Sequence, residues 1–455
     1  MATAATQPPQ SPRRWYRPTP GWAAVGLPAA VGLLWLSERF RWFAFNEHKG
    51  WTVLIAVALT GLTLAGLLAW FGVSLLLRWR FQFSLRSLLA LVVAVALPCS
   101  WLAVEVRRAE RQRQVATLVS LGRGLVEYQH EFDSSGCPLS DPQLPAPAWL
   151  RRLFGDDFFK TPVAALCSHA EDGDAAVAHL KELTDLRRVL LNCAKLTDAG
   201  LEHVQALTKL RVLDLSSTQI SDAGLQRLKG LTSLRSLNLD GTQVSDAGLR
   251  HVQALTQLDS LSLPFTPVGD DGLALLAGMK GLRSLWLDST KATDAGLAHL
   301  AALRELEQLG LSQTVVTDAG LKHLAGLTRL RLLVIGATKV SNAGLVHLKD
   351  MRELIWLDLS ATQVSDSGPE HLIGLPQLGM LYLEQTRITD AALRRLAELP
   401  RLASLDVKGT AISDAGLRHL QSARGLRFLY LERTQTTEAG VKELQQALPR
   451  CMIFH

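Results

Sequence analysis

Residues 221–244 read Ser221-Asp-Ala-Gly-Leu-Gln-Arg-Leu-Lys-Gly-Leu-Thr-Ser-Leu-Arg-Ser-Leu-Asn-Leu-Asp-Gly-Thr-Gln-Val244, and the chain repeats this pattern with a period of 24 residues. The opening pentad, Ser/Thr-Asp-Ala-Gly-Leu or a close variant, begins without insertion at 173, 197, 221, 245, 269, 293, 317, 341, 365, 389, 413 and 437. A unit of this length cannot bury its apolar face alone, so successive units stack around a shared core. We therefore predict one continuous solenoid of about twelve units over residues 173–455.

The apolar positions of each unit follow two spacings. Leu237 and Leu239 alternate with polar residues, as in a strand with one buried face. Leu225 and Leu228 lie three residues apart, as on the inner face of a short helical segment. Stacking then predicts an α/β solenoid with parallel strands on its concave face and short helices on its convex face.

The polar positions of the unit have structural explanations. The Ser or Thr that opens each unit can cap the helix, and the following Asp suits the positive helix N-terminus. Gly224 leaves room where neighbouring turns touch. Thr218, Thr242 and their counterparts through Thr434 are expected to bond the backbone of adjacent turns. We predict that these threonines form a ladder along the solenoid.

The period, together with the pattern Leu-x-x-Leu-x-Leu, resembles the leucine-rich repeats. The chain is most similar to the subtype that opens its convex helix with a Thr-Asp-Ala-Gly-Leu-like segment, found in bacterial membrane-anchored proteins and in F-box-associated repeats. The resemblance covers residues 173–455, about 62% of the chain. It implies a solenoid that binds another macromolecule and performs no chemistry.

Three apolar segments precede the repeats and indicate a membrane region. Residues 51–77 contain no charge over 27 positions, residues 88–104 form a second candidate span, and residues 22–36 a shorter third one containing Pro28. We predict a disordered tail at 1–21, a membrane region at 22–104 with two or three transmembrane helices, and a juxtamembrane helix, linker and N-terminal cap at 105–172. The chain is thus expected to be a multi-pass membrane protein in contact with the lipid bilayer.

The charge distribution supports this interpretation over nucleic-acid binding. Residues 1–113 carry 13 Lys and Arg against 4 acids, whereas the rest of the chain sums to −3, although the whole chain is +6. Basic residues beside apolar segments orient membrane helices. With three spans the two sides carry six and seven bases, and with two spans the ratio is ten to three. The second count predicts that the repeats face the cytoplasm.

Composition and motifs argue against catalysis. The 48% hydrophobic and 20% charged content excludes a disordered chain, and five cysteines without a C-x-x-C pair exclude a disulfide scaffold or a zinc site. No phosphate loop, nucleophile elbow or H-E-x-x-H occurs, and Asp156 and Asp157 suit a solvated helix end. Eight histidines share one convex position too widely spaced to bind one ion: His179, His203, His251, His299, His323, His347, His371 and His419. We predict no catalytic residue, metal or cofactor.

The exposed strand positions of the concave face carry the candidate binding site. Seven acids and one base, Lys408, occupy these positions in the units from 197 to 436, and every tryptophan and tyrosine of the repeats lies there. The candidate residues are Trp286, Trp356, Tyr382, Phe428, Tyr430, Asp214, Asp240, Asp288, Asp358, Glu384, Asp406 and Glu432.

The sequence thus predicts a non-enzymatic protein that binds a protein or peptide carrying Lys or Arg through its concave face. Carboxylates repel phosphate, so nucleic acid is not an expected partner. Two alternatives stay open: a structural membrane or envelope spacer, and a substrate-recognition subunit of an enzyme complex. The oligomeric state is left open as well.

Overall fold

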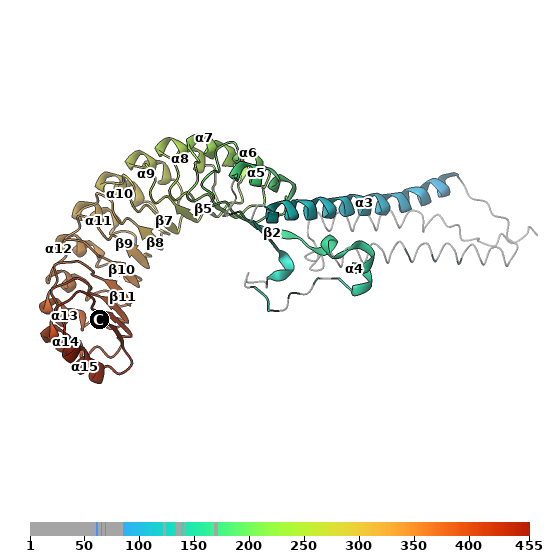
Figure 1. Ribbon diagram of the computed structural model, residues 1–455. Helices are drawn as coiled ribbons and strands as arrows, with labels where there is room; N and C mark the ends of the chain where they lie inside the picture. Colours follow the sequence, from blue (N-terminus) through green and yellow to red (C-terminus); the bar gives the residue numbers. More distant parts are fainter. Residues whose placement is uncertain are drawn as a thin grey trace, which may run out of the picture. The chain divides into compact units, whose positions relative to one another are not determined.

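The computed structural model describes residues 85–121, 124–132, 138–140, 142, 144, 146–167 and 172–455, together with residues 61, 65 and 69 (Figure 1). These residues divide into two compact units. The first comprises the described residues up to Arg113 and those of 130–160, and the second comprises 114–129 and 161–455.

The second unit is built on one sheet of 14 strands whose spatial order follows the chain order. β1 pairs with β2 in antiparallel fashion, and every later neighbour pair is parallel. The strands are β1 (Leu125–Tyr128), β2 (Pro162–Leu166), β3 (Arg188–Leu190), β4 (Val212–Asp214), β5 (Ser236–Asn238), β6 (Ser260–Ser262), β7 (Ser284–Trp286), β8 (Gln308–Gly310), β9 (Leu332–Val334), β10 (Trp356–Asp358), β11 (Met380–Tyr382), β12 (Ser404–Asp406), β13 (Phe428–Tyr430) and β14 (Met452–Phe454).

Short helices connect the strands and line the outer side of the curved repeats, while the strands line the inner side (Figure 1). The α-helices of this unit are α5 (Gly173–Ala178), α6 (Leu201–Val204), α7 (Asp222–Leu225), α8 (Asp246–Val252), α9 (Asp270–Leu276), α10 (Asp294–Leu300), α11 (Asp318–Leu324), α12 (Asn342–Leu345), α13 (Asp390–Leu396), α14 (Asp414–Leu420) and α15 (Glu438–Ala447). Turns of 3₁₀-helix are η4 (Leu180–Glu182), η5 (Gln226–Gly230), η6 (Val346–Leu348) and η7 (Gly368–His371). The predicted solenoid of 24-residue units is confirmed.

The core runs between the sheet and the helices. In the repeat that begins at Ser221, Leu225 and Leu228 on the helical side and Leu237 and Leu239 on the strand side are all at most 1% exposed. The same positions are buried in the following repeats, so one apolar cluster continues along the whole unit. Burial of a leucine side chain contributes about 1.5–3 kcal/mol, and here most of it depends on the neighbouring repeat.

The first repeat also has a cover on its open side. Val115 and Val119, near the end of α3 (Leu85–Leu121), and Val126 of β1 are buried in the same core as the leucines. The antiparallel strand β1 thus closes one edge of the sheet, and the apolar face of the helix end shields the core beneath it.

Carboxylates, rather than threonines, form the ladder between repeats. Asp222 accepts hydrogen bonds from both the backbone N–H (2.7 Å) and the hydroxyl (2.6 Å) of Ser245, which opens the next repeat. The same link recurs from Asp174–Thr197 to Asp414–Thr437. In two places one residue differs: Gly269 replaces the Ser or Thr and keeps only the backbone bond, and Asn342 replaces the Asp as the acceptor.

The predicted threonine ladder is wrong. The hydroxyl of Thr242 donates to the carbonyl oxygen of Leu239 in its own turn (2.6 Å), as Thr218 does to Leu215. The residue just before the threonine, Gly241 in this repeat, has a left-handed φ of 64°, and this conformation brings the threonine hydroxyl back toward the strand end. Ser217 adopts it in the preceding repeat at φ 57°. Each threonine therefore closes one turn instead of joining two.

The first unit has a small core of its own. Ala109 of α3 is buried with Leu150 of α4 (Ala148–Phe154) and with Phe158 and Phe159 of η3 (Asp156–Phe159). Trp101, in the predicted membrane span at 88–104, packs against this cluster together with Leu102 and Val106. A further turn, η2 (Gln129–Glu131), follows β1.

The described helices correct the predicted localisation. In the part of the chain that the structure describes, no helix has both the length and the apolar character needed to cross a membrane. The finding contradicts the multi-pass membrane prediction, with its span at 88–104 and the orientation derived from it. The physical reason lies in α3, which runs from Leu85 to Leu121 without a break through the charged segment 105–113. Within the predicted span, Trp101 and Leu102 pack against the small core of the first unit, whereas Val104 is 60% exposed. The other predicted spans, 22–36 and 51–77, lie outside the described residues apart from residues 61, 65 and 69.

Candidate functional site

The strands present every second side chain on the concave face. In β5, Leu237 is buried, whereas Ser236 and Asn238 are partly exposed. The parallel pairing joins residues one period apart, for example Trp356 with Met380, so each exposed position forms a row across the sheet. Neighbouring members of a row lie about 4.8 Å apart, which allows direct side-chain contact.

Two such rows bring apolar side chains together on the last strands. One row contains Leu332, Trp356, Met380, Ser404, Phe428 and Met452. The other contains Val334, Asp358, Tyr382, Asp406, Tyr430 and Phe454. The C-terminal concave surface, as we name it, consists of Trp356, Asp358, Met380, Tyr382, Glu384, Asp406, Lys408, Phe428, Tyr430, Glu432, Met452 and Phe454.

Its apolar side chains are stacked and open to solvent. The rings of Trp356 and Tyr382 stack with centroids 5.5 Å apart, and those of Tyr430 and Phe454 stack at 4.7 Å. Large apolar side chains remain exposed beside them, Phe428 to 41% and Met452 to 56%. Contiguous exposed apolar groups of this kind mark interaction sites on soluble domains.

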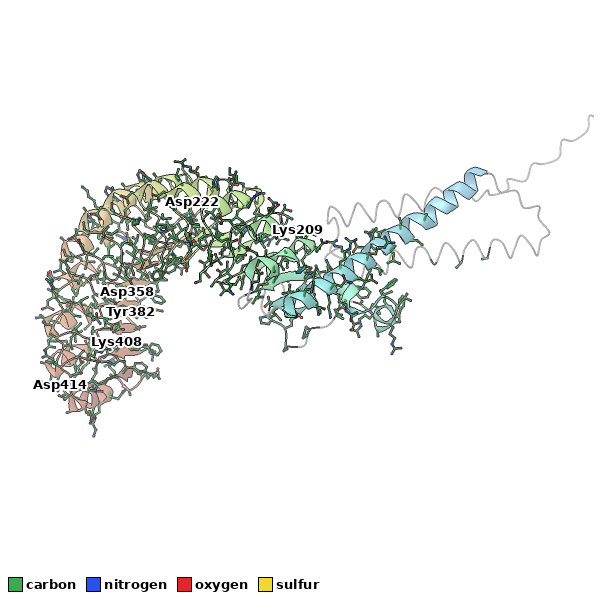
Figure 2. The ribbon with its side chains drawn as sticks, turned by 45° about the horizontal axis from the view of Figure 1, so that its top comes forward. Lys209, Asp222, Asp358, Tyr382, Lys408 and Asp414 are labelled. Carbon is green, nitrogen blue, oxygen red and sulfur yellow. The ribbon has the colours of Figure 1, made fainter. Side chains whose placement is uncertain are left out.

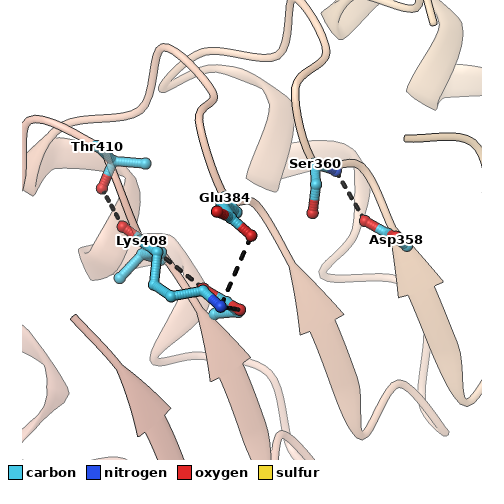
Figure 3. Close-up of polar contacts among 7 residues, drawn as sticks. Asp358, Ser360, Glu384, Lys408 and Thr410 are labelled. Atoms are coloured by element: carbon cyan, nitrogen blue, oxygen red, sulfur yellow. Dashed lines mark hydrogen bonds and ion pairs between the residues drawn. The ribbon is translucent and has the colours of Figure 1, made fainter. Parts of the chain in front are cut away.

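Carboxylates surround one ammonium group on this surface (Figure 3). The Nζ of Lys408 lies 3.1 Å from Oδ2 of Asp406, 3.6 Å from Oε2 of Glu384 and 5.5 Å from the ring centroid of Tyr430. Burial alone would lower the pKa of Lys408, but the hydrogen bond and charge of Asp406 outweigh it and raise the pKa. For Asp406, in contrast, burial raises the pKa, although its bonds to Lys408 favour the charged form.

Asp358 is held in a similar way but without an ammonium group. Its Oδ1 accepts the backbone N–H of Ser360 at 2.8 Å, as Oδ1 of Asp406 accepts that of Lys408 at 3.0 Å. Asp358, Tyr382 and Lys408 follow one another along the inner side of the C-terminal repeats (Figure 2). Among the described residues, the indole N–H of Trp356 is buried without a hydrogen-bond partner.

Trp286 and Asp288 form a separate pair at β7. The indole N–H of Trp286 donates to the hydroxyl of Ser284 at 2.9 Å, and Asp288 accepts the backbone N–H of Ser312 at 2.8 Å. Both side chains lean over Gly310 on the next strand, where a Cβ would lie 2.5 Å from the Trp286 ring and from Asp288. Burial raises the pKa of Asp288, although the N–H of Ser312 favours its charged form.

Asp214 and Asp240 lie apart from the aromatic residues. Asp214 ends β4 and accepts the backbone N–H of Ser216 at 2.9 Å, while Asp240 follows β5 and accepts the hydroxyl of Ser262 at 2.6 Å. Burial raises the pKa of Asp240. The structure therefore gathers eight of the twelve predicted residues on β10–β13 and the loops after them, and separates Trp286, Asp288, Asp214 and Asp240.

The leucine-rich repeat region family matches residues 167–452, more than half of the chain. The protein belongs to the leucine-rich-repeat family. A search of curated proteins finds no match to this chain.

Solved structures similar to this leucine-rich-repeat protein come from several organisms. An internalin of Listeria monocytogenes is 22% identical with a TM-score of 0.48, covering 61% of this chain and 82% of its own. A leucine-rich-repeat protein of Leptospira interrogans is 17% identical with a TM-score of 0.39, covering 61% of this chain and 86% of its own. The plant peptide hormone receptor RGFR1, in complex with RGF2, is 15% identical with a TM-score of 0.40, covering 61% and 44%.

The histidines at the shared repeat position of this leucine-rich-repeat protein lie on its convex side. His299, His323 and His419 are exposed, and His347 and His371 are partly exposed. Within the described residues, no group of three or more His, Cys, Asp or Glu could hold a metal ion. At the predicted solvated helix end, Asp157 pairs with Lys160 at 2.9 Å.

Sequence reasoning missed three apolar members of the C-terminal concave surface. Met380 was among the exposed strand positions, but only aromatic and charged residues were selected there. Met452 and Phe454 belong to β14, one period beyond the positions surveyed. Extending the period of 24 residues to the last strand would have found them, because Phe454 continues the row of Tyr430.

Proposed function

We propose that the repeat domain is a non-catalytic binding module whose C-terminal concave surface contacts a segment of a partner protein carrying Lys or Arg. Solenoids commonly bind through their concave face. The observation that carries the proposal is the coincidence of exposed apolar side chains, such as Phe428 and Met452, with carboxylates on the same strands.

The two kinds of residue have different roles in this proposal. Stacked aromatic rings such as Trp356 and Tyr382 supply most of the binding free energy, because large rigid side chains lose little entropy when they are covered. The carboxylates Asp358, Glu384 and Glu432 raise the encounter rate and select basic partners. The excess of acids over bases also disfavours nucleic acid, whose phosphates they repel.

The test is a crosslinking pull-down with the full chain, followed by affinity measurement on the captured protein. Trp356→Ala and Tyr382→Ala should each weaken binding by about 1–3 kcal/mol, a factor of roughly 5 to 150. High salt should weaken binding of the unaltered chain and of both variants, because it screens the carboxylates. Both side chains lie on the exposed side of their strands, so thermal unfolding should stay close to that of the unaltered chain.

The control uses the convex side. His323→Gln and His347→Gln should leave binding unchanged, because these side chains lie on the helices opposite the sheet. If the histidine changes weaken binding and the aromatic changes do not, the proposed face is wrong. If capture survives all four changes, the partner binds another surface and the proposed face is wrong. If the unaltered chain captures no protein, a spacer role becomes the better explanation.

A further inference from the structure

Lys408 shows what the carboxylates of this surface accommodate. Its ammonium group is held by Asp406 of its own repeat, by Glu384 of the preceding repeat and by the ring of Tyr430 from the following repeat. Two carboxylates and an aromatic face together form a binding position for a cation. The chain fills this position with its own side chain.

Asp358 occupies the same exposed position two repeats earlier, with the same backbone hydrogen bond. Residue 360 is Ser where Lys408 stands in the later repeat, so the chain supplies no ammonium group from that position. Gly336 stands where Glu384 precedes Lys408, and both carboxylate oxygens of Asp358 lie 3.5 Å from the place of a Gly336 Cβ. The side toward the preceding repeat therefore lacks a covering side chain.

The aromatic wall on the other side of Asp358 is present. Tyr382 is its neighbour on the next strand, as Tyr430 is the neighbour of Asp406, and Trp356 stacks on Tyr382 at 5.5 Å. The position thus keeps one carboxylate and the ring of the Lys408 arrangement, and it has neither the ammonium group nor the second carboxylate that Glu384 supplies there.

We propose that Asp358 binds the ammonium or guanidinium group of a partner's Lys or Arg side chain, whose aliphatic stem packs on Tyr382 and Trp356. A basic side chain suits this place better than a neutral one, because a carboxylate with one oxygen committed to Ser360 still has acceptor capacity for a charged donor. This inference rests on the proposed binding function, and it specifies which group of the partner the surface selects.

The test selects short random peptides, displayed on phage, against the immobilised full chain and sequences the enriched pool. The unaltered chain should enrich Lys and Arg several-fold over the input library. Asp358→Asn keeps the acceptor for the Ser360 N–H but removes the charge, and it should abolish that enrichment. Ser360→Lys places an ammonium group as Lys408 does beside Asp406, and it should abolish the enrichment without removing the carboxylate.

Matched controls are available on β4. Asp214 accepts the backbone N–H of Ser216 at 2.9 Å, as Asp358 does from Ser360, but its row neighbours are Leu190 and Asn238 instead of aromatic residues. Asp214→Asn and Ser216→Lys make the same chemical changes outside the proposed surface. Both should retain the enrichment of Lys and Arg.

The outcomes separate this inference from the proposed function. If Asp358→Asn and Ser360→Lys keep the enrichment, or if the unaltered chain enriches no basic peptide, the cation position is wrong. The binding function itself fails only if the selected peptides also bind Trp356→Ala and Tyr382→Ala as tightly as the unaltered chain. An equal loss of Lys and Arg enrichment in the β4 controls would show that the overall charge of the chain, and not the position of Asp358, selects basic peptides. This result would also overturn the cation position.

Discussion

Asp222 and Gly248 belong to successive repeats, and a Cβ added to Gly248 would overlap Oδ1 of Asp222. The same carboxylate accepts the backbone N–H and the hydroxyl of Ser245, three residues before the glycine. The serine, the aspartate and the glycine of the pentad therefore act together: the aspartate of one repeat binds the serine of the next and lies directly against its glycine. The repeat that begins at Thr389 has Ala392 at this position and keeps the link from Asp366 to Thr389.

Gly248→Ala should destabilise the fold by about 1–3 kcal/mol, because the new methyl group must displace the Asp222 carboxylate and the buried backbone behind it. Urea unfolding of the full chain measures the change. The control is Gly278→Ala, where a Cβ meets nothing within 4 Å, and this variant should lose no stability. Equal effects at the two sites would disprove the steric explanation.

Asp222→Ala should cost about 1–3 kcal/mol, since the backbone N–H of Ser245 loses its acceptor between two repeats. Asp222→Asn should cost much less. The chain already uses an amide at this position in Asn342, whose Oδ1 accepts the N–H of Ser365 at 2.9 Å while its Nδ2 donates to the Ser365 hydroxyl at 2.7 Å. Comparison of the two variants by thermal unfolding tests whether geometry or charge matters; an equal loss would favour charge.

Deletion of residues 245–268, one whole period, should leave a cooperatively folding and shorter solenoid. Leu237 would then be followed in the sheet by Leu285, which has the same buried position as the deleted Leu261. Deletion of only residues 245–256 should abolish the cooperative transition, because helical positions would meet strand positions in the stack. Circular dichroism during heating distinguishes the two, and similar damage from both deletions would refute the modular stacking.

Asp288→Asn should raise the melting temperature at pH 7. Burial raises the pKa of Asp288 in the folded state, so the unfolded chain loses this proton at lower pH than the folded chain does. The native state therefore loses stability as the pH rises from the ordinary aspartate pKa through the raised value, and the asparagine avoids this loss. The advantage should vanish below the ordinary aspartate pKa; a variant less stable at pH 7 would contradict the sign.

The membrane prediction treated residues 88–104 as a separate apolar segment. In the structure they are part of α3, a single helix that continues through the charged residues 105–113. Phe158 and Phe159, more than fifty residues away, form the cluster against which Trp101 and Leu102 pack. The local sequence of residues 88–104 does not predict these contacts.

The sequence by itself determined the period, the solenoid, the buried leucines and the face on which the aromatic residues stand, because each follows from spacing along a strand or a short helix. Only the tertiary structure decided which polar groups meet between repeats. Asp222 reaches Ser245 across 23 residues, whereas Thr242 turns back to Leu239, and no pattern of residue types distinguishes these two outcomes. The reason is physical: spacing predicts which side a residue faces, but a hydrogen bond depends on the path of the backbone between the two groups, here a left-handed residue at Gly241.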